Sequence, residues 1–141
     1  MNKPLRPFHL AFPIYDIKKT ISWYTNILGC TIGRQDKRWV DFNFFGHQIS
    51  GHLIDKNDEE INTNIVDGEN IPCRHFGIIL NRANWNDLSQ NLISKNIDFI
   101  VKPTIRFKDK KGEQATFFIK DPNGNVLEFK SFKDDKMIFD N

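Results

Sequence analysis

The sequence predicts an α+β fold built from two similar halves, and three observations indicate it. Between about residues 7 and 54, a short strand, an amphipathic helix and three strand-like runs follow one another. The same order returns between about residues 71 and 132. The intervening residues 55–70 are polar, acidic and rich in turn formers, as expected of a linker or surface loop. Each half alone would leave one sheet face bare, so the halves should pack as one domain over 1–141 or against a second chain.

In the first half, an apolar strand over residues 8–12 ends near Pro13. Asp16 is a suitable N-cap for the helix that follows, and Gly29 stands where a left-handed C-cap is wanted. The apolar stripe of this helix consists of Ile17, Ile21, Tyr24 and Leu28. Strands are predicted over 30–34, 38–44 and 47–54, with Phe45-Gly46 as the turn between the last two.

The second half begins with a predicted strand over residues 73–80, and Asn84 is a candidate N-cap for its helix. The stripe of that helix is Trp85, Leu88 and Leu92, and Asn96 can end it. The remaining strands are predicted over 97–101, 104–107, 114–120 and 125–132, with a strong turn at residues 121–124. The tail, 133–141, is expected either to fray or to pack on a partner chain.

Composition restricts the classes of partner. The 141 residues are 39% hydrophobic and 27% charged with a net charge of +2, which favours neither nucleic acid nor a membrane surface as a partner. No apolar run reaches signal-peptide or membrane-spanning length. Two isolated cysteines, Cys30 and Cys73, suggest reduced thiols and hence a cytoplasmic protein, with Cys73 expected to be a buried thiol.

The candidate ligands of a metal are His9, His75 and Glu128, with His52 as a fourth. Each of the two histidines that open a half shares its strand face with a small residue, Ala11 after His9 and Gly77 after His75. His52 and Glu128 lie in the last strands of the two halves, so four ligand-type side chains occupy positions that the duplication makes equivalent. Imidazole and carboxylate suit Fe(II), Mn, Ni or Zn, and the pattern does not choose among them. A single strand histidine is more often a satisfied polar residue, but a carboxylate in an apolar strand is costly unless it is paired or bound to a metal.

The chain resembles the vicinal oxygen chelate superfamily of glyoxalases, bleomycin-resistance proteins and extradiol dioxygenases. The resemblance covers about residues 8–132 and depends on the opening strand histidine, on Trp23-Tyr24 followed by Leu28-Gly29, and on the closing DPNGNVLEF at 121–129. It implies two βαβββ modules forming a curved mixed sheet around a central cleft, and a homodimer. It also implies metal ligands at His9, His75 and Glu128, spaced by 66 and 53 residues as in a dioxygenase-type triad, and a glyoxalase-type fourth ligand at His52.

Two functions follow from the resemblance. One is a metal-dependent enzyme that chelates adjacent oxygens of a small-molecule substrate, with lyase/isomerase or dioxygenase chemistry. The alternative is a metal-free binding protein of the bleomycin-resistance kind, against which the retained ligands count.

Extradiol enzymes typically carry a histidine and a tyrosine in the second module, whereas this chain has no histidine after His75 and its tyrosines are Tyr15 and Tyr24. Arg106 and Gln114 are weaker candidates for binding an anionic or carbonyl group.

Overall fold

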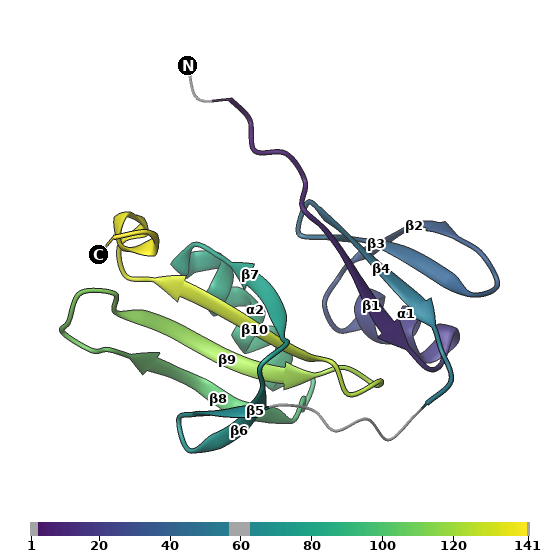
Figure 1. Ribbon diagram of the computed structural model, residues 1–141. Helices are drawn as coiled ribbons and strands as arrows, with labels where there is room; N and C mark the ends of the chain where they lie inside the picture. Colours follow the sequence, from purple (N-terminus) through teal and green to yellow (C-terminus); the bar gives the residue numbers. More distant parts are fainter. Residues whose placement is uncertain (1–2, 57–62, 141) are drawn as a thin grey trace. The chain divides into compact units, whose positions relative to one another are not determined.

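The computed structural model describes residues 3–56 and 63–140. The chain divides into two compact units, Met1–Asp58 and Glu59–Asn141 (Figure 1), and each unit is described by itself. The division falls inside the segment 55–70 that was predicted to link the halves. Both units carry the predicted α+β composition, with one α-helix and a four-stranded mixed sheet in each.

The first unit contains β1 (His9–Ile14), α1 (Ile17–Asn26), β2 (Thr31–Gln35), β3 (Trp39–Phe44) and β4 (His47–Leu53). Its sheet has the order β1-β4-β3-β2, with β1 and β4 parallel and the other neighbours antiparallel. The side chain of Asp16 caps α1 by accepting a hydrogen bond from the Lys19 amide, as predicted. Tyr24 of α1 is fully buried and stacks on Phe42 of β3, with ring centres 4.9 Å apart.

The helix covers one face of this first sheet. Strand alternation sends Phe12 and Ile14 of β1 into the core, whereas His9 and Ala11 point to the opposite, exposed face. The open face therefore carries the polar side chains that a site could use.

The second unit contains β7 (Phe76–Ile79), α2 (Arg82–Ser94), β8 (Phe99–Arg106), β9 (Gln114–Lys120), β10 (Val126–Phe132) and a short 3-10 helix, η1 (Asp135–Ile138). Its sheet repeats the topology of the first, in the order β7-β10-β9-β8 with β7 and β10 parallel. On the α2 side, Phe117 stacks on Phe129, and the buried Trp85 indole donates a 2.9 Å hydrogen bond to the Phe129 carbonyl.

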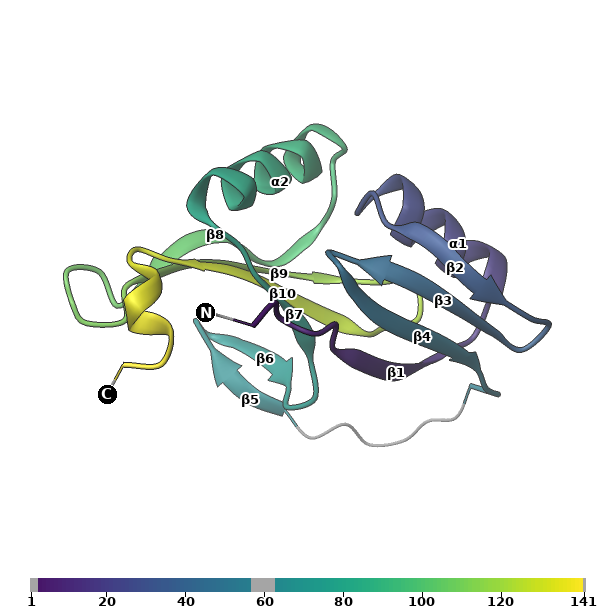
Figure 2. The ribbon, with the colours of Figure 1, turned by 90° about the horizontal axis from the view of Figure 1, so that it is seen from above.

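A β-hairpin occupies part of the predicted linker, so the interpretation of residues 63–70 as a loop is wrong. The strands β5 (Thr63–Val66) and β6 (Glu69–Pro72) pair around Asp67-Gly68, both of which have positive φ. Figure 2 shows the hairpin on the side of the second sheet opposite α2, and Val66 and Ile71 pack there with Val101, Phe118 and Val126. Burial of these apolar side chains outweighs the polar composition of the segment. Residues 57–62 of the predicted linker lie outside the described part of the chain.

Other differences from the predictions are local. The N-cap of α2 is Asn81 rather than Asn84, because the Asn81 side chain accepts from the Asn84 amide at 2.8 Å. The strands predicted over 97–101 and 104–107 form a single strand, β8, with register shifts. Cys73 was expected to be buried but is exposed, since it follows the hairpin, whereas Cys30 is buried. The tail forms η1, whose Met137 sulfur accepts a hydrogen bond from the Gly112 amide.

Candidate functional site

The second unit brings two of the predicted ligand residues together. His75 lies one residue before β7, and Glu128 lies in the middle of β10, the strand parallel to it. The imidazole Nε2 of His75 is 3.4 Å from the carboxylate Oε1 of Glu128. Both side chains are partly accessible, with exposed fractions of 24% and 13%, so solvent or a ligand can reach them. The parallel pairing of two strands some fifty residues apart in sequence creates this contact.

Hydrogen bonding determines which imidazole nitrogen faces the carboxylate. Nδ1 of His75 is 2.8 Å from the carbonyl oxygen of Pro72. A carbonyl only accepts, so Nδ1 carries the proton and donates it. Nε2 is consequently the nitrogen left to coordinate a cation, in the arrangement by which backbone carbonyls orient metal-binding histidines. The ring also packs edge-on against Phe118, at 5.3 Å between centres, which restricts its rotation.

The carboxylate is held from its other side. Thr116 of β9 is fully buried, and its hydroxyl donates a 2.6 Å hydrogen bond to Oε2 of Glu128. Oε2 is thereby occupied and Oε1 is directed toward His75. Sequence reasoning missed Thr116; strand alternation could have placed it on the face of Phe118, which pairs with Glu128.

Gly77 is required by the close approach of β7 to β10. It pairs with Glu128, and a Cβ atom at this position would overlap the Glu128 carbonyl oxygen. The sequence predicts that a small residue here leaves room in front of the imidazole, and in the structure even a methyl group cannot fit beside β10. A hollow of about 190 Å³ lies at this place, lined by residues of β7 and β10 together with His75.

The first unit places His9 and His52 on the open face of its own sheet. His9 pairs with Gln48, whereas His52 pairs with Pro13. The two histidines are therefore offset by four residues, about 13 Å along the strands. This spacing is too long for both imidazoles to bind one ion within this unit. Both side chains are exposed.

The predicted equivalence of His52 and Glu128 is corrected by strand register. In the second unit, Glu128 pairs with the residue two after the opening histidine; in the first, the residue in that place is Ser50, opposite Ala11. The Ser50 hydroxyl donates to Asp41 at 2.5 Å. His52 lies two residues beyond the equivalent position. The sequence shows that both residues lie in the last strand of a half, but it does not show that their registers differ by two residues.

His47 and the two predicted substrate-binding residues, Arg106 and Gln114, have partners within their own units. His47 accepts a hydrogen bond from the Phe8 amide at Nδ1, 2.8 Å away. Arg106 forms an ion pair with Asp67 of the β5–β6 turn, with Nε and Oδ1 3.5 Å apart. Gln114 is buried, pairs with Arg106 across the sheet and donates to the Gly112 carbonyl at 3.4 Å. The role of Arg106 and Gln114 in substrate binding stays a prediction.

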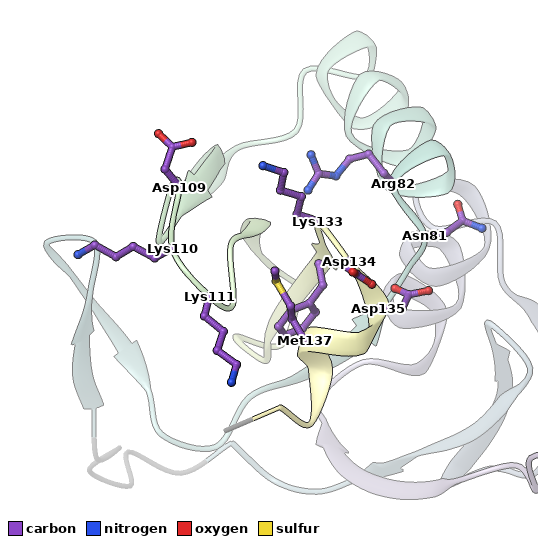
Figure 3. A pocket seen from close by; sticks show the side chains of 10 residues that line it. Asn81, Arg82, Asp109, Lys110, Lys111, Lys133, Asp134, Asp135 and Met137 are labelled. Carbon is purple, nitrogen blue, oxygen red and sulfur yellow. The ribbon is translucent and has the colours of Figure 1, made fainter.

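A larger hollow, of about 980 Å³, lies away from this pair, between the start of α2, the β8–β9 loop and η1 (Figure 3). Its walls mix cations with carboxylates, and several of these charges are already paired. Arg82 donates to the Ser131 carbonyl, Lys111 pairs with Asp140 at 3.3 Å, and Lys133 lies 3.9 Å from Glu113. None of the predicted site residues lines it, so we place the candidate site at His75 and Glu128.

Within residues 3–56 and 63–140, no three or more His, Cys, Asp or Glu side chains form a cluster that could hold a metal. The pair His75–Glu128 is the part of the predicted ligand set that the second unit assembles by itself. Over the same residues, no helix has the length and apolar character needed to cross a membrane.

Comparison with known proteins identifies the family. The sequence profile of the Glyoxalase/Bleomycin resistance protein/Dioxygenase superfamily matches residues 6–129. A crystal structure of a glyoxalase/bleomycin resistance protein/dioxygenase from Alicyclobacillus acidocaldarius is 33% identical, with a TM-score of 0.83, covering 99% of this chain and 100% of that chain. No curated protein matches the chain.

Two more distant structures share the fold alone. The genomically encoded fosfomycin resistance protein FosX from Listeria monocytogenes is 13% identical with a TM-score of 0.62, covering 97% of this chain and 98% of that one. A glyoxalase/bleomycin resistance protein/dioxygenase from Nocardioides is 15% identical with a TM-score of 0.64, covering 94% and 85%.

Proposed function

This chain belongs to the glyoxalase/bleomycin resistance protein/dioxygenase superfamily, and we propose that within it the chain is a metal-dependent enzyme whose small-molecule substrate chelates the metal through adjacent oxygens. The observation that carries the proposal is the imidazole Nε2 of His75 facing the Glu128 carboxylate at 3.4 Å, each group held by a hydrogen bond from its far side.

The donor set fits a divalent cation. Bonds of about 2.0–2.2 Å from imidazole nitrogen and carboxylate oxygen to one ion, at octahedral or tetrahedral angles, put the two ligand atoms about 2.8–3.6 Å apart. The 3.4 Å separation lies in this range. With Nδ1 donating to Pro72, Nε2 faces Oε1, and when Nε2 carries no proton its lone pair and the carboxylate can both bind a cation placed between them. Mixed nitrogen and oxygen donors suit Fe(II), Mn, Ni and Zn alike.

The resemblance implies further ligands at His9 and at His52, but the offset of the two along the first sheet allows only one of them to join a given ion within this unit. Register supports His9 more than His52, because His9 has the same place relative to Ala11 and Ser50 that His75 has relative to Gly77 and Glu128. Both remain predictions that metal binding by their variants tests.

In this proposal the protein residues bind and orient. His75 and Glu128 would hold the ion. Thr116 keeps Oε1 of Glu128 turned toward His75, and Gly77 lets the two strands approach closely enough for this geometry. A bound divalent ion would supply Lewis-acid stabilisation of negative charge developing on the substrate oxygens, a need common to lyase/isomerase and dioxygenase reactions.

The test is metal retention by the purified protein. The wild type is loaded separately with Fe(II), Mn, Ni or Zn, dialysed and analysed for bound metal, beside His75→Ala and Glu128→Gln. His47→Ala and Glu69→Gln are matched controls, since His47 is occupied by the Phe8 amide and Glu69 is exposed on β6. We expect both site variants to lose metal and both controls to keep it. A wild type that retains none of the four metals would overturn the proposal.

Turnover then separates the chemistries. Ring cleavage of catechol would indicate dioxygenase chemistry, and conversion of methylglyoxal with glutathione would indicate the glyoxalase kind. The His9→Ala and His52→Ala variants, assayed for bound metal in parallel, report on the remaining predicted ligands.

A further inference from the structure

Lys130 is a charged residue that the predicted site did not include. It lies on β10 two residues after Glu128, and strand alternation places both side chains on the same face of the sheet. Its neighbours across the sheet are Ile79 of β7 and Thr116 of β9, the residue that holds the Glu128 carboxylate. His75, Glu128 and Lys130 are the three ionisable residues that line the hollow of about 190 Å³.

Among residues 3–56 and 63–140, no carboxylate forms an ion pair with the ammonium group of Lys130. Its Nζ lies 5.8 Å from the centre of the Phe132 ring. Glu128, the one carboxylate lining the hollow, has Oε2 bonded to Thr116 and Oε1 beside His75. The contact with Phe132 is a weak cation–π interaction, which an anion can replace.

The charges around this hollow indicate which class of ligand it attracts. A divalent cation held by His75 and Glu128 keeps one positive charge after the carboxylate is counted, and Lys130 adds a second. Residues two apart on a strand lie about 7 Å apart, a distance that the flexible lysine stem can span to reach a molecule bound beside Glu128. Like charges of this kind, close together and partly shielded from solvent, favour an anionic ligand.

We infer that Lys130 determines substrate specificity, and that the substrate is an anion carrying a carboxylate, phosphate or phosphonate beside the oxygens that bind the metal. The inference rests on the proposed function, because the metal supplies half of the positive charge. Lys130 receives the anionic group, and the adjacent oxygens would bind a metal held by His75 and Glu128.

The test uses oxalate, a dianion with adjacent oxygens, and inorganic phosphate as probes on the Mn-loaded full chain. Their dissociation constants are measured by calorimetry for the wild type, Lys130→Gln and Lys130→Arg. Lys102→Gln is the control for net charge, since Lys102 is exposed on β8. Bound Mn is measured in every sample.

Loss of a charge-assisted hydrogen bond should weaken oxalate binding by about tenfold to a hundredfold in Lys130→Gln. We expect Lys130→Arg to bind within a few-fold of the wild type, the control to be unchanged, and Mn content to be full in all. If Lys130→Gln with full Mn binds both probes as tightly as the wild type, the role of Lys130 is refuted while the metal site stands. A wild type that takes up no metal overturns both proposals.

Discussion

Replacing Thr116 by valine removes one hydroxyl and keeps the side-chain shape. That hydroxyl donates to Oε2 of Glu128 at 2.6 Å from a fully buried position, and the Glu128 side chain is only 13% exposed. A hydrogen bond to a charged group contributes about 1.5–3 kcal/mol, and little water can replace the lost donor. We therefore expect Thr116→Val to lower the free energy of unfolding by about 1.5–3 kcal/mol. If the pair binds metal, loss of this orienting contact should also weaken metal affinity by about 10–100-fold.

The assay is urea denaturation of metal-free protein followed by titration with Zn. Thr116→Ser is the matched variant, because it keeps the donor and removes one methyl group, at a cost of about 1 kcal/mol. The serine variant should retain metal affinity near that of the wild type, whereas the valine variant should not. Equal metal affinity in the two variants would refute the reasoning that Thr116 orients the carboxylate.

Three further predictions concern packing, thiol chemistry and ligand-linked stability. Gly77→Ala should destabilise the fold by about 3 kcal/mol or more, or prevent soluble expression, because its Cβ would overlap the Glu128 carbonyl. Gly33→Ala is the control: its Cβ would meet its nearest atom at 3.4 Å, so the urea midpoint should be nearly unchanged. Burial raises the pKa of Cys30 to about 12. A thiol reagent at pH 8 should therefore modify only the exposed Cys73 in native protein and both thiols in urea. Rapid labelling of Cys30 in native protein would contradict this. Since that raised pKa disfavours the thiolate in the folded state, its contribution to stability should be present below pH 9 and fall as the pH rises from 9 toward 12. Zn at a hundred times its dissociation constant should stabilise the wild type by about 2.7 kcal/mol, reversibly with chelator, and Glu128→Gln should show no such shift.

Local signals in the sequence were enough to predict most of the elements. Asp16 caps α1 and Gly29 follows it with a φ of 73°, as the sequence pattern predicts. The β5–β6 hairpin was missed because the polar composition of the whole segment concealed a short local signal. Asp67-Gly68 is a turn pair that favours positive φ, and its flanking Val66 and Ile71 are buried only through contacts with the second sheet.

By itself, the sequence determined the two-part α+β architecture and the residue types that a metal site would need. Periodicity and turn chemistry act over a few residues, so they can be read along the chain. Only the tertiary structure decided which residues become neighbours across strands. It brought His75 to Glu128 and put Ser50 rather than His52 in the equivalent place. It also set Thr116 and Lys130, which pair with each other across β9 and β10, next to Glu128 on one face of the sheet. Strand register depends on pairing between distant segments, and a shift of two residues preserves the face while changing every cross-strand partner.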